Sequence, residues 1–161
     1  MKRENLVKTL GAFGLLGILF LGSCKKDDKA VDTEYPTIDV SAADAFPKQC
    51  SEIKRGETFV FKARLKDNVQ LGSFSLDVHH NFDHHSHSTE VNDCTMDPVK
   101  TPVNPFLYIK SFPIPAGSSS YSASVEIPVP ADIEPGDYHF MILVTDAEGW
   151  QTIKGLSIKI R

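Results

Sequence analysis

Apolar and polar side chains alternate with a period of two residues through most of this 161-residue chain. Such alternation is typical of a β-strand with one buried face, because successive side chains of a strand point to opposite sides. Residues 57–67 show it clearly, since Phe59, Phe61 and Leu65 would share one face and basic residues the other. Beyond the N-terminal region, no stretch repeats with the 3.6-residue period of a helix. The sequence therefore predicts an all-β fold.

Proline and glycine separate these alternating runs, as turns require. Residues 136–146 are apolar on both faces after their start, which predicts a central strand. About seven short strands with turns between them favour an immunoglobulin-like β-sandwich, with a barrel as the alternative. The expected strands cover residues 36–42, 57–67, 71–80, 106–112, 119–130, 136–146 and 151–161.

The N-terminal residues have the composition of an export signal. Residues 1–8 are basic, residues 10–22 are apolar and uncharged, and the segment LGSC at residues 21–24 resembles a bacterial lipobox. We expect residues 1–23 to be a lipoprotein signal peptide, cleaved before a lipidated Cys24. The alternative is an uncleaved anchor, which the short apolar run disfavours because a membrane span takes about 20 residues.

Residues 24–35 are charged and poor in bulky apolar side chains, which predicts a flexible tether before a globular domain at residues 36–161. The KKDD segment after Cys24 resembles the export signal of Bacteroidota lipoproteins. We therefore expect a lipid anchor in the bacterial outer membrane, with the domain facing the periplasm or the cell surface. Cleavage would change the formal net charge from −4 to −6, and nucleic acid is not expected as a partner because it needs a basic surface.

Cys50 and Cys94 are the two cysteines that remain after Cys24. In an exported domain a pair of cysteines most simply forms a disulfide. A free thiol nucleophile is the alternative, and an oxidising compartment disfavours it. Cys94 lies in the long stretch from His80 to Ser118, which fits a compact sandwich badly, so the bridge would fasten that stretch to the domain.

A local signature at residues 133–140, IEPGDYHF, is similar to the tyrosine corner of immunoglobulin-like sandwiches, with Tyr138 as the corner residue. Together with the lipobox, the block DNVQLGSFSLDVHHNFDHHSHS and the block PGDYHFMILVTDAEGW, it resembles a family of Bacteroidota lipoproteins of unknown function (domain of unknown function 4625). The resemblance implies an immunoglobulin-like fold with a histidine-rich insert, and it brings no catalytic activity.

Five of the six histidines lie between residues 79 and 87, in the segment HHNFDHHSH. Neutral imidazole is the commonest protein ligand for metal ions, and the expected ion is zinc, with copper or nickel as alternatives. Met96 is the one soft ligand expected nearby, so nitrogen-preferring metals are favoured over Cu(I). The candidate metal ligands are His79, His80, His84, His85, His87, His139 and Asp83. Asp83 could bind the ion directly or could orient a histidine ring instead.

His139 joins this set because of the expected strand pairing. In an immunoglobulin-like sandwich the strand that ends at His80 would run antiparallel to the strand that starts near Gly136. His79 and His139 would then be neighbours on one face, with His85 and His87 folding back from the loop. His79 and His80 point to opposite faces, as do His84 and His85, so the full set cannot serve one ion without a bulge.

Three other interpretations compete with a metal site. The histidines could form solvated or pH-responsive surface. Alternatively, the histidine loop could recognise a protein or glycan, which the long insert with Phe106, Tyr108 and Phe112 suggests. Asp67, Asn68 and Asp146 offer oxygen donors that suit calcium, but their spacing matches no calcium loop and turn chemistry explains them.

The chain shows no nucleophile elbow, paired carboxylates or phosphate loop, so an enzyme is not expected. The histidine segment and the lipobox together predict three partners: a metal ion, the membrane, and an outer-membrane transporter that could receive the ion.

Overall fold

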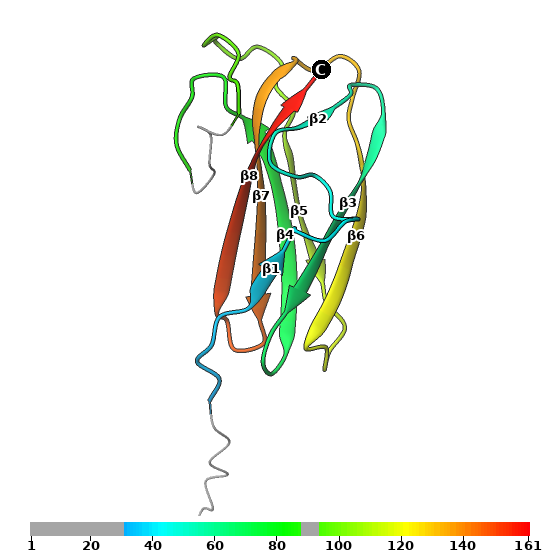
Figure 1. The fold of residues 1–161 in the computed structure, drawn as a ribbon, viewed down its shortest axis with the longest axis vertical. Helices are drawn as coiled ribbons and strands as arrows, with labels where there is room; N and C mark the ends of the chain where they lie inside the picture. Colours follow the sequence, from blue (N-terminus) through cyan, green and yellow to red (C-terminus); the bar gives the residue numbers. More distant parts are fainter. Residues whose placement is uncertain (1–30, 88–93) are drawn as a thin grey trace, which may run out of the picture. The chain divides into compact units, whose positions relative to one another are not determined.

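The computed structural model describes residues 31–87 and 94–161, and this part of the chain contains β-strands and no helix. Accordingly, the described residues include no helix that could cross a membrane. The strands form two sheets that face each other, as Figure 1 shows. The predicted all-β, immunoglobulin-like sandwich is confirmed.

The three-stranded sheet has the order β1-β3-β6, and the five-stranded sheet has the order β2-β8-β7-β4-β5. All seven predicted strands are present. The eighth strand, β2, was not predicted. It forms by parallel pairing with β8, a long-range contact that leaves no local sequence pattern. The strands are β1 (Thr37–Asp39), β2 (Ser51–Ile53), β3 (Thr58–Lys66), β4 (Leu71–His80), β5 (Tyr108–Pro113), β6 (Ser120–Pro128), β7 (Gly136–Asp146) and β8 (Gln151–Ile160).

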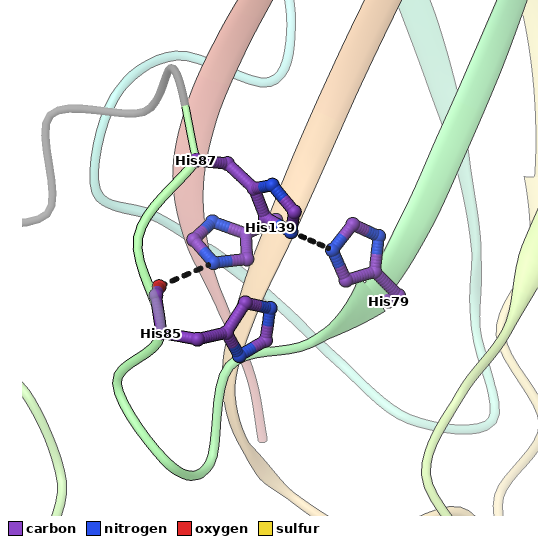
Figure 2. A group of neighbouring side chains, drawn as sticks. All are labelled: His79, His85, His87 and His139. Atoms are coloured by element: carbon purple, nitrogen blue, oxygen red, sulfur yellow. Dashed lines mark hydrogen bonds between the residues drawn. The ribbon is translucent and has the colours of Figure 1, made fainter.

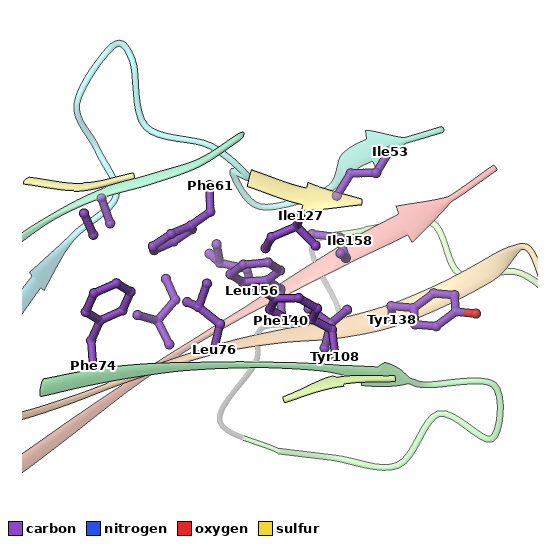
Figure 3. Close-up of a cluster of buried hydrophobic side chains, with 14 of the residues drawn as sticks. Ile53, Phe61, Phe74, Leu76, Tyr108, Ile127, Tyr138, Phe140, Leu156 and Ile158 are labelled. Carbon is purple, nitrogen blue, oxygen red and sulfur yellow. The ribbon is translucent and has the colours of Figure 1, made fainter. Parts of the chain in front are cut away.

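The core lies between the two sheets and is filled by alternate residues of each strand (Figure 3). The rings of Phe61 from β3 and Phe140 from β7 stack across it with centroids 5.5 Å apart. Phe106 and Tyr108 are buried in the same core, and Phe112 packs against it. These three aromatic residues therefore stabilise the fold. Phe106 and Tyr108 are not available to a binding partner, so they do not support the alternative of a recognition surface, and Phe112 is only partly exposed.

Tyr138 forms the predicted tyrosine corner at the start of β7. Its hydroxyl donates a hydrogen bond to the carbonyl of Glu134 at 2.6 Å and accepts one from the backbone N–H of Phe106 at 3.1 Å. Because the ring is buried, both bonds are shielded from water. The corner thus fixes the end of the long loop between β4 and β5 to the first residues of β7.

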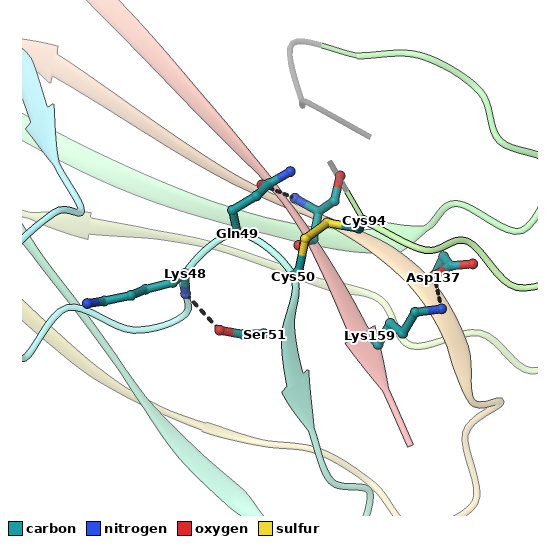
Figure 4. The surroundings of a disulfide bond; sticks show 8 residues. Lys48, Gln49, Cys50, Ser51, Cys94, Asp137 and Lys159 are labelled. Atoms are coloured by element: carbon teal, nitrogen blue, oxygen red, sulfur yellow. Dashed lines mark hydrogen bonds and ion pairs between the residues drawn. A yellow bond between two sulfur atoms is a disulfide. The ribbon is translucent and has the colours of Figure 1, made fainter. Parts of the chain in front are cut away.

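The predicted disulfide between Cys50 and Cys94 is confirmed (Figure 4). It ties the loop after β4 to the segment before β2. The loop start is held separately, because Phe82 is buried against Gly136 of β7, where an added Cβ would lie 2.7 Å from the Phe82 ring. The loop histidines, His84, His85 and His87, thus lie in the sequence between two fixed points, Phe82 and Cys94.

Asp97 holds the next part of this loop. Its carboxylate accepts hydrogen bonds from two guanidinium nitrogens of Arg161 and from the ammonium of Lys159, which also pairs with Asp137. The hydrogen bonds from Arg161 first, and then from Lys159, lower the pKa of Asp97 to about 2. Ion pairs therefore link the loop to the end of β8, while the disulfide links it to the segment before β2.

We expect the free energy of unfolding to fall as the pH drops from about 4 to about 2. The pKa of Asp97 is lower in the folded chain than the ordinary value of 3.8, so the ion pairs stabilise the fold above that pH and are lost as the carboxylate protonates. Because the side chain is one-third exposed, the effect is about 1–2 kcal/mol. Urea unfolding of Asp97→Asn should lack this component, while Asp44→Asn, at an exposed surface pair, should retain it.

The N-terminal boundary of the domain differs from the expected one. Residues 31–35, predicted as the end of the tether, belong to the compact unit that begins at Val31. Asp32 is buried, its carbonyl accepts a hydrogen bond from the indole N–H of Trp150, and the ring of Tyr35 contacts the same indole. The predicted signal peptide, the lipidated Cys24 and residues 24–30 of the tether lie outside the described residues.

Candidate metal centre

Two of the candidate histidines are brought together by strand pairing. β4 and β7 run antiparallel with His79 directly opposite His139, as the expected topology required. Both side chains lie on the outer face of the five-stranded sheet, since the alternate residues Val78 and Phe140 are buried in the core. The ring centroids are 5.3 Å apart.

The loop after β4 then folds back over this face and adds two more imidazoles (Figure 2). The ring of His87 lies 4.9 Å from that of His79 and 4.8 Å from that of His139, and His85 lies 4.9 Å from His139. One ring nitrogen from each of the four residues lies within 4.8 Å of the others. We call His79, His85, His87 and His139 the histidine cluster.

Two imidazoles of the histidine cluster are oriented by carboxylates. Nδ1 of His79 lies 2.8 Å from a carboxylate oxygen of Asp77, and Nδ1 of His85 lies within hydrogen-bond distance of Asp83. In each case the aspartate precedes the histidine by two residues. A carboxylate on Nδ1 holds the proton there, so that Nε2 keeps its lone pair, as in the carboxylate–histidine–metal arrangement.

The Nε2 atoms of two rings in the cluster already face each other. The Nε2 atoms of His79 and His87 are 3.0 Å apart. Two nitrogens that bind one zinc ion at about 2.0–2.1 Å in a tetrahedron would be separated by about 3.3 Å. The nitrogens of His79 and His87 are therefore close to the spacing that one ion requires, and the nitrogens of the cluster as a whole, which lie within 4.8 Å of one another, would move closer on binding.

Burial keeps parts of the cluster in the neutral form that binds metals. His139 is fully buried under the loop, and this burial lowers its pKa to about 4. Burial followed by the nearby imidazoles of His79 and His85 lowers the pKa of His87 as well. His139 also has Nε2 3.2 Å from the carbonyl oxygen of His85, a contact that fixes its ring against the loop.

The structure does not bring His80, His84 and Asp83 into the ligand sphere with the others. His80 is on the opposite face of β4 and its ring packs on Phe82. His84 has φ +58° and its Nε2 lies 2.9 Å from the carbonyl oxygen of Asp97, so its ring points toward a later part of the same loop. Strand alternation explains the exclusion of His80, and the left-handed backbone conformation at position 84 turns His84 away from the cluster. Asp83 orients His85 instead of joining the cluster.

The soft ligand next to the cluster is Met141, which was not predicted. It lies two residues after His139 on the same face of β7, and it lines a shallow groove together with His79 and His87. Met96 lines a separate cavity beside the disulfide. The alternation within β7 was the signal that could have identified Met141.

Fold and site together define an immunoglobulin-like β-sandwich that carries a histidine cluster on the outer face of one sheet. The chain belongs to the family described as domain of unknown function (DUF4625), which matches residues 22–161. No curated protein sequence matches it.

The solved structures that resemble the fold include the following two. One is wild-type OgpA from Akkermansia muciniphila, with a TM-score of 0.44, 12% identity and coverage of 70% of this chain and 30% of that chain. The other is the GspB Siglec domain, with a TM-score of 0.42, 23% identity and coverage of 81% and 59% respectively. The chain thus spans less than two thirds of either protein, and neither likeness is close enough to indicate a function.

Proposed function

We propose that the protein binds a transition metal ion, zinc first, through the histidine cluster, for capture or buffering at the cell envelope. The single observation that supports this is the convergence of four imidazole nitrogens within 4.8 Å of one another. They come from two strands and a folded-back loop, and two of them are held by carboxylates on their second nitrogen. Histidines that were only solvated surface residues would not be expected to converge in this way.

The donor set favours zinc over other ions. Four nitrogens with no thiolate suit zinc in a tetrahedron, and copper(II) or nickel(II) would need a flatter arrangement of the same rings. Four protein ligands also fill a tetrahedral zinc site, whereas a catalytic zinc keeps one position for water. Capture is therefore a better fit than catalysis, and we propose no enzymatic activity.

Equilibrium dialysis of the chelator-stripped protein against Zn²⁺ tests this function. We expect one ion per chain with a dissociation constant below about 1 μM, because structural sites of this kind bind far more tightly. Parallel dialysis against Cu²⁺ and Ni²⁺ ranks the alternatives. A dissociation constant above the micromolar range for all three ions would contradict the proposal.

The location follows from the N-terminal residues and is part of the same proposal. Lipidation at Cys24 would anchor the protein in a bacterial outer membrane, where an ion could pass to a transporter in that membrane. Mass spectrometry of the native protein after membrane extraction tests the anchor. A mature N-terminus other than an acylated Cys24 would contradict it.

A second candidate function is an interaction module for a protein or glycan at the cell surface. The observation that favours it is the apolar surface beside the cluster, where Ile109 and Ile153 are 63% and 55% exposed on the outer face of the sheet. Met141 and Leu143 line the groove between them. Capture of a partner that persists with a chelator present throughout would favour this function over metal binding.

A further inference from the structure

Three aspartates meet at the other end of the sandwich, away from the histidine cluster. Asp67 follows β3, Asp146 ends β7, and Asp32 lies in the segment before β1. One carboxylate oxygen from each lies within 4.8 Å of those of the other two. These residues are separated by up to 114 positions in the chain, so tertiary structure alone brings them together.

Each carboxylate uses its Oδ1 atom for local structure. Oδ1 of Asp146 accepts hydrogen bonds from the backbone N–H groups of Gly149 and Trp150, in the turn between β7 and β8. Oδ1 of Asp67 accepts from the N–H groups of Val69 and Gln70 in the turn before β4. Turn chemistry accounts for these two oxygens and leaves the second oxygen of each carboxylate unexplained.

Oδ1 of Asp32 is used in a similar way, since it accepts from the N–H of Glu34 and from the side-chain amide of Asn68. The backbone carbonyl of Asp32 is also occupied, by the indole N–H of Trp150. Asn68 and Trp150, one from each turn, thus hold Asp32 beside the other two aspartates.

The remaining oxygens of Asp67 and Asp146 have no partner. Both Oδ2 atoms are buried, and no described group donates a hydrogen bond to either. Asp146 as a whole is 4% exposed and Asp32 8%. No lysine or arginine within residues 31–87 and 94–161 forms an ion pair with any of the three. Buried carboxylate oxygens without a donor are costly and need a counter-charge.

We propose that Asp32, Asp67 and Asp146 bind a calcium ion that fastens residues 31–36 to the two turns at this end of the domain. Three carboxylates present only oxygen, which is the ligand of hard cations, and Ca²⁺ accepts six to eight such ligands with flexible geometry. Water would complete the coordination. Mg²⁺ demands a stricter octahedron and retains more of its water, so this loose set of donors selects calcium.

The test is calcium titration of the chelator-stripped full chain, by calorimetry and by thermal unfolding. Sites in extracellular modules bind calcium with dissociation constants of about 0.1–1 mM. At 10 mM Ca²⁺ we expect Tm to rise by about 5 °C. Mg²⁺ at the same concentration should raise it less. No rise in Tm with Ca²⁺ would overturn the proposal.

The Asp146→Asn variant tests calcium binding while it retains the hydrogen bonds that form the turn between β7 and β8. The amide retains an oxygen that can accept from Gly149 and Trp150, and it replaces the unpaired oxygen with a donor toward the other carboxylates. We expect calcium affinity to fall by at least about tenfold, with a Tm in chelator equal to or above that of the wild type.

Asp67→Asn provides a second variant on the same principle, and Asp132→Asn, at an exposed aspartate, is the control. A calcium-dependent rise in Tm that is equal in Asp146→Asn and Asp132→Asn would overturn the proposal.

Discussion

Replacing His79 and His87 together with alanine is expected to reduce the affinity for zinc at least about a thousandfold. Structural zinc sites with four ligands gain about 10–16 kcal/mol of apparent binding energy, so each ligand contributes several kcal/mol. The two residues are chosen because their Nε2 atoms face each other at 3.0 Å and neither ring is fully buried. His139 stays in place under the loop, so the fold should not change. Competition with a chromophoric chelator measures the loss.

The same stretch of sequence offers a matched control in His80 and His84, which lie outside the histidine cluster. His80→Ala combined with His84→Asn removes the same number of imidazoles, and asparagine tolerates the positive φ of position 84. Its zinc affinity should stay close to that of the wild type. An equal loss in both double variants would mean that the segment binds zinc without a defined geometry.

Removing the disulfide with Cys50→Ser and Cys94→Ser is expected to lower the free energy of unfolding by about 2–4 kcal/mol. The bridge joins residues 44 positions apart, and the chain-entropy model gives about 4 kcal/mol for a loop of that length, which native-state strain reduces. Urea unfolding measures the change. Wild-type protein treated with a phosphine reductant should behave in the same way.

Zinc affinity should fall in the same variant, because Cys94 holds the far end of the loop that carries His85 and His87. Without the bridge, zinc binding must itself order that loop, at a cost in conformational entropy. The remaining anchors at Phe82 and Asp97 limit the loss, so it should be smaller than in the histidine variant. An unchanged zinc affinity beside reduced stability would show that the loop keeps its order without the disulfide.

Sequence patterning predicted the fold well where strands are long enough to show a period. Residues 57–67 and 136–146 are examples, since alternation and burial there agree with the observed strands. β2 has three residues and is held by its parallel pairing with β8, a long-range contact that local sequence does not record. Asp32 lies in a polar segment whose composition predicts a tether. Its contacts with Asn68 and Trp150 are long-range, so local sequence does not record them either.

In the candidate site, too, strand alternation predicted some residues, whereas the roles of others depend on tertiary contacts. The pairing of His79 with His139 was predictable, because the tyrosine corner set the start of β7 and alternation set the face. Exclusion of His80 also follows from alternation. The roles of Asp83 and Asp77 were harder to assign, since a carboxylate beside a histidine can bind a metal or orient a ring. Phe106 and Tyr108 looked available in a proline-rich loop, and only packing shows that they belong to the core.

β4 separates the histidine cluster from the end of the domain where the chain enters. It runs from Leu71, near the turn of Asp67, to His80, and ten extended residues span about 30 Å. Asp32, at the point of entry, lies at the opposite end of this strand from His79. An ion held by the histidine cluster would therefore lie about 30 Å from the calcium ion proposed at the other end of the domain, so the two ions should bind independently of each other.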